Sequence, residues 1–92
     1  MIDGKTVFIT GAARGIGLSI AQAFAEQGAN VVISDMNEQR LAEAVEQNPR
    51  LTAFTCDVTD EQAVSDAIAF TIEKFNTLDI LINNAGFQHV SY

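Results

Sequence analysis

Four short apolar segments along the chain predict β-strands, because they are rich in β-branched residues and too short for buried helices. These segments span residues 6–10, 31–34, 51–56 and 79–83. Three of the four are apolar without the alternation of a half-exposed strand, a pattern typical of strands covered on both faces. The sequence therefore favours a parallel sheet with helices on either side.

Longer segments between these strands place apolar residues at helical spacing. The predicted helices span residues 15–27, 37–47 and 60–75. Ile16, Ile20 and Phe24 recur every fourth residue in the first helix and predict its buried face. Leu41 and Val45 mark a narrower apolar stripe in the second helix. Each helix is thus expected to pack one side against the sheet.

The third helix has an apolar face that consists of Val64, Ile68, Ile72 and Phe75. Thr59, with Gln62 three residues later, matches a capping box, in which two side chains satisfy free backbone N–H groups of the first turn. We therefore expect Thr59 to cap the start of this helix.

The order of these elements is β-α-β-α-β-α-β, and the connections between them are tight. Such alternation implies right-handed crossovers and helices on both faces of a parallel sheet. The predicted fold is an α/β, Rossmann-type doubly wound sheet with strand order 3-2-1-4, which places a ligand crevice at the carboxyl ends of the first and fourth strands. The 92 residues support one domain at most. This domain spans residues 1–92 and is only the N-terminal part of the doubly wound sheet.

Composition narrows the possible partners and the compartment. The chain has 12 acidic and 5 basic residues and a net charge of -7, which argues against nucleic acid or an anionic membrane as a partner. No apolar run is long enough for a membrane helix, and no secretory signal is present. Cys56 is the only cysteine, so we interpret it as a core residue of a cytoplasmic protein. With His89 the only histidine, no metal site is expected.

The segment "TGAARGIG" (10–17) joins the first strand to the first helix and has glycines at Gly11, Gly15 and Gly17. This spacing does not match the common G-x-G-x-x-G fingerprint. Glycines here still permit a tight turn and a close approach of the backbone to a pyrophosphate, which the N-terminus of the next helix attracts. The alternative is a tight strand-to-helix turn without a ligand.

Asp35 ends the second strand, 18 residues after Gly17. An acid at this distance can accept hydrogen bonds from the adenosine ribose hydroxyls of NAD, and it would repel the 2′-phosphate of NADP. The alternative is a turn aspartate that caps the next helix. Arg14 complicates the prediction, because a cation in the glycine loop could reach a 2′-phosphate.

"TGAARGIG", Asp35, "CDVTD" (56–60) and "NNAG" (83–86) follow in the order found in the short-chain dehydrogenase/reductase family, which this chain resembles over essentially its whole length. The resemblance implies an oxidoreductase that binds NAD in preference to NADP. It implies a pyrophosphate site in the glycine loop, an adenine contact after the third strand, and a segment that closes the fourth strand against the cofactor. The implied pyrophosphate site consists of Gly11, Arg14, Gly15, Ile16 and Gly17. The implied adenine contact consists of Asp57 and Val58, and the segment that closes the fourth strand consists of Asn84, Ala85 and Gly86.

The tail "NNAGFQHV" is similar to the corresponding stretch of D-3-hydroxybutyrate dehydrogenases, in which the glutamine helps to hold the substrate carboxylate. The resemblance assigns this role to Gln88 and implies a small hydroxy acid or ketone as substrate, with a homotetrameric full-length relative. The alternative is that Gln88 is an exposed loop residue. His89 is interpreted as a packing or loop residue.

The family's catalytic Ser and Tyr-x-x-x-Lys pair do not occur in these 92 residues, so we assign no catalytic residue and expect this chain alone to be inactive. Three hypotheses remain: the cofactor-binding part of a longer NAD-dependent dehydrogenase, a non-catalytic nucleotide-binding module, and a truncation product without a stable fold. The coding sequence after Tyr92 separates them, because only the first requires the missing residues to follow.

Overall fold

A computed structural model, which describes residues 2–85, contains a four-stranded sheet and three helices. The strands are β1 (Thr6–Thr10), β2 (Asn30–Asp35), β3 (Leu51–Thr55) and β4 (Ile80–Asn83). The helices are α1 (Gly15–Glu26), α2 (Glu38–Gln47) and α3 (Glu61–Phe75). Every predicted element is therefore present, and its ends differ from the prediction by at most one residue. No helix within residues 2–85 has the length and apolar character needed to cross a membrane.

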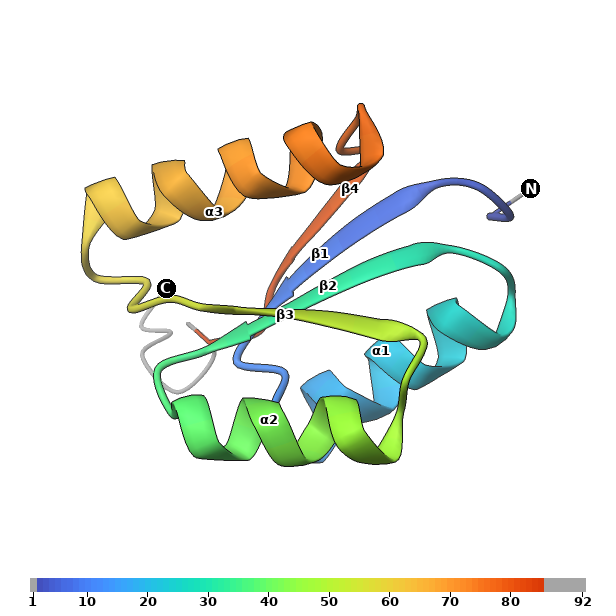
Figure 1. Cartoon of the computed structure of the whole chain (residues 1–92), viewed down its shortest axis with the longest axis horizontal. Helices are drawn as coiled ribbons and strands as arrows, with labels where there is room; N and C mark the ends of the chain where they lie inside the picture. Colours follow the sequence, from blue (N-terminus) through green and yellow to red (C-terminus); the bar gives the residue numbers. More distant parts are fainter. Residues whose placement is uncertain (1, 86–92) are drawn as a thin grey trace, which may run out of the picture.

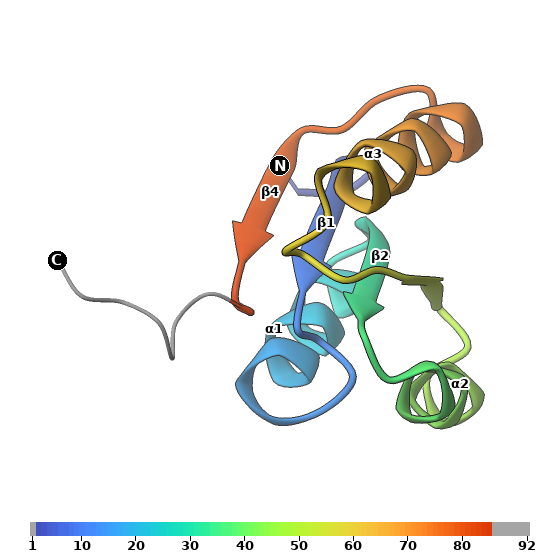
Figure 2. The ribbon, with the colours of Figure 1, turned by 90° about the vertical axis from the view of Figure 1, so that its left-hand side faces the viewer.

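The sheet is parallel and has the order β3-β2-β1-β4, as the alternation of elements predicts. Helices α1 and α2 cover one face, and α3 covers the other (Figure 1). The view along the sheet in Figure 2 separates these three layers and places β4 at one edge. The fold class is thus a Rossmann-type α/β sheet, and the carboxyl ends of all strands point to one side of the molecule.

The two faces of the sheet form two separate apolar cores. Val7 and Ile9 of β1 pack on the side of α1 and α2, whereas Phe8 packs on the side of α3. All five residues of β1 are buried, because this strand lies inside the sheet with helices on both faces. Full burial of a side chain of this size contributes roughly 1.5–3 kcal/mol each. These cores hold the carboxyl end of β1 in place, where the glycine loop begins.

Strand β4 is less covered than its neighbour β1. Its burial alternates between half-buried and exposed residues, and 55% of Leu81 is exposed. Ile80 and Ile82 pack partly against the core on the α1 side. Within residues 2–85, β4 pairs only with β1.

The predicted buried face of α1 is wrong at Ile16, which is 72% exposed. The buried residues of this helix are Gly17, Ala21 and Ala25. These small residues recur every fourth position and let the helix backbone lie close to the sheet, so the larger apolar side chains are displaced to its flank. Ile20, on that flank, is only partly buried.

The start and the buried face of α3 also differ from the prediction. Asp60, not Thr59, caps the helix, because the Asp60 carboxylate accepts hydrogen bonds from the N–H groups of Gln62 and Ala63. The Thr59 side chain instead donates to the preceding Asp57. A carboxylate one residue later in the chain thus reaches the same free N–H groups that the capping box would satisfy.

The buried residues of α3 are Ala67 and Thr71, whereas the predicted face residue Ile72 is 44% exposed. The Thr71 hydroxyl donates to the Ala67 carbonyl at 2.9 Å, which allows this polar residue to be buried inside the helix layer. The helical spacing was therefore correct, but the side facing the sheet is rotated from the most apolar stripe.

Candidate dinucleotide-binding site

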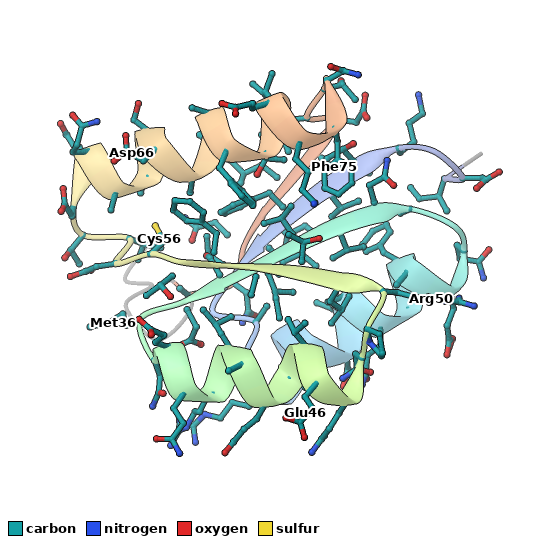
Figure 3. All side chains as sticks on the ribbon, in the orientation of Figure 1. Met36, Glu46, Arg50, Cys56, Asp66 and Phe75 are labelled. Carbon is teal, nitrogen blue, oxygen red and sulfur yellow. The ribbon has the colours of Figure 1, made fainter. Side chains whose placement is uncertain are left out.

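A cavity of about 620 Å³ lies at the carboxyl ends of the strands, where open α/β sheets bind ligands. The loop after β1, the end of β2, the segment after β3 and the end of β4 all contribute to its lining. Met36 and Cys56, which line it, lie at the same end of the sheet in Figure 3, and Arg50 lies at the opposite end. The cavity thus occupies the position predicted for a crevice.

The N-terminus of α1 borders this cavity without a side-chain cap. Arg14 occupies the N-cap position in an extended conformation and forms no capping hydrogen bond, and both Arg14 and Gly15 line the cavity. The side chains of Asn37 and Asp60 cap α2 and α3. Among the helices of residues 2–85, α1 therefore alone offers its first-turn N–H groups and its positive dipole end to an anion.

The glycines of the loop allow it to pack directly against the end of β4. A Cβ atom on Gly17 would lie 2.6 Å from the Gly11 carbonyl oxygen and 2.8 Å from Asn84 Nδ2. A Cβ atom on Gly11, whose φ is +62°, would lie 2.9 Å from Ala85 Cα. The Asn84 side-chain amide uses this closeness to donate to the Gly11 carbonyl at 3.0 Å. The loop and the end of β4 thus form one wall.

Thr10 joins the same two segments, although sequence analysis did not identify it. Its hydroxyl donates to Asn83 Oδ1 at 3.1 Å and accepts a hydrogen bond from the Ala85 N–H at 3.1 Å. A hydroxyl can donate and accept at once, so a single side chain fixes the end of β4 against the end of β1. The available signal was a threonine directly before the first loop glycine, at a strand end.

Asp35 lies half-buried at the end of β2 and lines the cavity. Its Oδ1 accepts a hydrogen bond from the Asn37 N–H at 3.0 Å, so the carboxylate also stabilises the turn into α2. The cap of α2 is Asn37 itself, whose side chain accepts from the Arg40 N–H. Asp35 therefore belongs to the turn before α2 without capping that helix, and it also lines the cavity.

Asp57 lies after β3 and lines the same cavity together with Val58. Its Oδ1 accepts hydrogen bonds from the Thr59 hydroxyl at 2.7 Å and from the Thr59 N–H at 2.9 Å. These two bonds stabilise the charged form and lower the pKa of Asp57 below its usual value. The carboxylate is therefore ionised and oriented at neutral pH.

Cys56 lines the cavity but behaves as a core residue. It is 3% exposed and packs with Phe8, Val32 and Ala67. Burial, and secondarily the negative charge of nearby Asp57, raises the pKa of the Cys56 thiol. The thiol stays protonated at neutral pH and is a poor nucleophile, which agrees with its interpretation as a packing residue.

The structure brings most of the predicted cofactor residues into one cavity. Those that line it are Gly11, Arg14, Gly15, Asp35, Asp57, Val58, Asn84 and Ala85. Gly17 lies behind the lining, and Ile16 lies along the flank of α1 instead. Gly86 and Gln88 lie outside the described residues. Met36, 69% exposed beside Asp35, is a lining residue that the sequence analysis missed.

Comparison with known proteins identifies the class to which this fold and cavity belong. The model of the short chain dehydrogenase family matches residues 5–92. The chain therefore belongs to the short-chain dehydrogenase family. Sorbitol dehydrogenase of Cereibacter sphaeroides is 44% identical over 86 residues, which cover 92% of this chain and 34% of that protein. L-fucose dehydrogenase of Bos taurus is 44% identical over 85 residues, which cover 92% of this chain and 32% of that protein.

Solved structures agree with this assignment. A hydroxysteroid dehydrogenase from Escherichia coli superposes with a TM-score of 0.84 at 42% identity, over 89% of this chain and 37% of that protein. A 3-ketoacyl-(acyl-carrier-protein) reductase from Brucella melitensis, complexed with NADH, has a TM-score of 0.82 at 33% identity, over 88% of this chain and 34% of that protein. The chain spans about a third of the length of these relatives.

Proposed function

We propose that residues 1–92 are the NAD-binding part of a short-chain oxidoreductase that interconverts a secondary alcohol and a ketone. The observation that carries this proposal is the uncapped N-terminus of α1, which borders a cavity of about 620 Å³ that is also lined by Asp35. The N-terminus of α1 favours an anion, and the Asp35 carboxylate offers a hydrogen-bond acceptor for hydroxyl groups. A dinucleotide carries both groups, because its pyrophosphate is joined to ribose.

The lining residues fit the parts of such a cofactor. The N–H groups at the start of α1 bind the pyrophosphate, and Gly11 leaves its backbone open to close approach. Asp57 and Val58 lie against the adenine, and Asn84 and Ala85 form the wall at the end of β4. When bound, the cofactor would accept a hydride from the alcohol in its oxidised form or supply one to the ketone in its reduced form.

Asp35 favours NAD over NADP in this proposal. Its carboxylate accepts hydrogen bonds from the ribose hydroxyls, whereas a 2′-phosphate would bring like charge against it. The NADH complex of the related reductase from Brucella melitensis supports a nicotinamide dinucleotide as the class of ligand.

Titration of the 92-residue chain with NADH and NADPH tests the proposed function. We expect NADH to bind at least about tenfold more tightly, because of the repulsion at Asp35. Isothermal calorimetry measures both affinities. Equal affinities would show that Asp35 does not discriminate between the two dinucleotides, and a folded chain that binds neither dinucleotide would overturn the proposal.

We also expect no NAD reduction when the 92-residue chain is mixed with 3-hydroxybutyrate. Turnover by this chain would reveal an unrecognised catalytic group.

For the substrate we propose 3-hydroxybutyrate and acetoacetate, on the similarity of the tail sequence "FQHV". The known relatives act on several substrates by their names, including sorbitol and L-fucose, so this choice depends on Gln88 alone. A neutral amide can donate hydrogen bonds to a carboxylate without a buried counter-charge.

The substrate is tested by replacing Gln88 with alanine in an active full-length enzyme that carries this sequence. The KM for 3-hydroxybutyrate should rise by about tenfold, which corresponds to the loss of a hydrogen bond to a charged group. His89→Ala is the matched control and should leave KM nearly unchanged. Equal KM values for Gln88→Ala and the wild type would exclude this substrate role.

A further inference from the structure

A groove lies between the carboxyl-terminal ends of α1 and α2, at the end of the sheet where the strands begin. Its volume is about 530 Å³, and its lining comes from both helices and from the turn that connects α2 to β3. Arg50, which lines it, lies at the opposite end of the sheet from Met36 and Cys56 of the dinucleotide cavity (Figure 3). The two hollows share no lining residue. This helix-end groove is therefore a separate candidate site, whose lining includes Gln22, Glu26, Asn48 and Arg50.

Hydrogen bonds between side chains and backbone fix the walls of the helix-end groove. Gln22 Nε2 of α1 donates to Asn48 Oδ1 at 2.9 Å, and Asn48 Nδ2 donates to the Ala44 carbonyl of α2 at 2.9 Å. Beneath these polar groups, Ala25 and Leu51 supply a buried apolar part of the lining. An apolar base with a few fixed polar groups is typical of small-molecule sites, and a preformed site binds without an ordering cost.

One charge of each sign lines the helix-end groove. Glu26 is the last residue of α1, and Arg50 lies in the turn after α2. Both side chains are exposed, and within residues 2–85 the two form no ion pair with each other. The carboxylate and the guanidinium thus border the same hollow without neutralising each other. A ligand that lies between them can bind to both.

The two helix ends add to the negative side of the groove. The carboxyl-terminal end of a helix carries a partial negative charge, which favours a cation. Neither α1 nor α2 has a basic residue in its last turn, so no side chain there compensates this charge. Arg50 is the one cation among the lining residues. The groove therefore favours a cationic group beside Glu26 and an anionic group beside Arg50.

We propose that the helix-end groove binds a zwitterionic α-amino acid. The ammonium group lies against Glu26 and the end of α1, and the carboxylate accepts paired hydrogen bonds from the Arg50 guanidinium. The exposed amide of Gln47 can donate and accept, which suits a ligand with a polar side chain. Glu26 disfavours a dicarboxylate or a phosphate, and Arg50 disfavours a polyamine. This site does not depend on the proposed function, because it lies away from the dinucleotide cavity.

Titration of the 92-residue chain with L-glutamine tests this proposal. The side-chain amide signals of Gln22 and Asn48 in the NMR spectrum should shift and saturate, with a Kd of about 1 mM for a ligand of this size. Two analogues each lack one charged group: glutaramate has no ammonium group, and 4-aminobutanamide has no carboxylate. Each should bind at least about fivefold more weakly than L-glutamine, because one charged contact is lost.

Variants assign each charged group of the ligand to one side chain. Arg50→Gln should weaken L-glutamine binding about fivefold and leave it no tighter than that of 4-aminobutanamide, because the carboxylate has lost its partner. Glu26→Gln should have the same effect relative to glutaramate. The matched controls are Arg40→Gln, in the first turn of α2, and Glu73→Gln, in α3 on the other face of the sheet (Figure 1). All four side chains are exposed, so the fold should be retained.

Three results would exclude the amino-acid site: no saturable shift of the Gln22 and Asn48 signals, equal affinities for L-glutamine and its two analogues, or a Kd that either charge variant leaves as the controls do. Selective losses in Arg50→Gln and Glu26→Gln, each with its own analogue, support the site. Titration with NADH measures the other cavity, so failure of the amino-acid site leaves the proposed function standing.

Discussion

Replacing Gly17 with alanine is expected to destabilise the protein by about 1–3 kcal/mol and to weaken NADH binding by about tenfold. The added Cβ atom would lie 2.6 Å from the Gly11 carbonyl oxygen and 2.8 Å from Asn84 Nδ2, two atoms that are hydrogen-bonded to each other. Neither can move freely, since one belongs to the backbone and the other anchors the end of β4. The substitution therefore has to separate the glycine loop from β4.

Thermal unfolding followed by circular dichroism and calorimetry with NADH measure the two effects. Helix propensity alone would favour alanine over glycine by about 1 kcal/mol. A net loss of stability in Gly17→Ala would therefore result from the close contact of the added Cβ atom and not from a change in helix propensity. Ser19→Ala, at an exposed position of α1, is the control and should leave both quantities nearly unchanged. An unchanged Asn84 side-chain amide signal in the NMR spectrum of Gly17→Ala would contradict the predicted separation.

Replacing Asp35 with asparagine is expected to shift the ratio of NADPH to NADH affinity by about 100-fold toward NADPH. Two unit charges about 4 Å apart interact by about 4 kcal/mol at an effective dielectric constant of about 20, and exposure and salt reduce this value. Losing that repulsion should strengthen NADPH binding about tenfold. Losing a charged acceptor for the ribose hydroxyls should weaken NADH binding by a similar factor.

Asparagine keeps an oxygen that can accept the hydrogen bond from the Asn37 N–H, so the turn into α2 should be preserved. Asp66→Asn removes the same charge from α3, whose position in Figure 3 is on the other face of the sheet. This control should not alter the affinity ratio. A ratio that stays constant in Asp35→Asn would show that another group sets the cofactor preference.

Local patterns in the sequence were sufficient for the order and the limits of the elements. Short β-branched runs and helical spacing depend on neighbours along the chain, and they placed every end within one residue. The orientation of the helices was less predictable. Ile16 and Ile72 belong to apolar stripes but are exposed, because small residues such as Ala21 and Ala67 let the helix backbones approach the sheet.

The residues of the candidate site also divide into those that local sequence patterns predict and those that they do not. Gly11 and Asp35 could be identified one by one, because each lies at the carboxyl end of a strand on the same side of a parallel sheet, and the family resemblance added Asp57. Thr10 and Met36 could not, because a threonine in a strand and a methionine in a turn have no distinctive pattern. Their roles arise from contacts with segments that are distant in sequence or from the surface that the fold leaves exposed.

By itself, the sequence determined the parallel α/β fold, its strand order and the residues that follow each strand, since these depend on local periodicity and on the handedness of crossovers. Only the tertiary structure decided which of those residues share one cavity and how the cavity is held. The hydrogen bonds of Thr10 and Asn84 bridge 73 to 75 positions in the chain, and α1 and α2 contribute to one groove only because they lie on the same face of the sheet. Such contacts between distant segments form when the helices pack, and no local pattern encodes them.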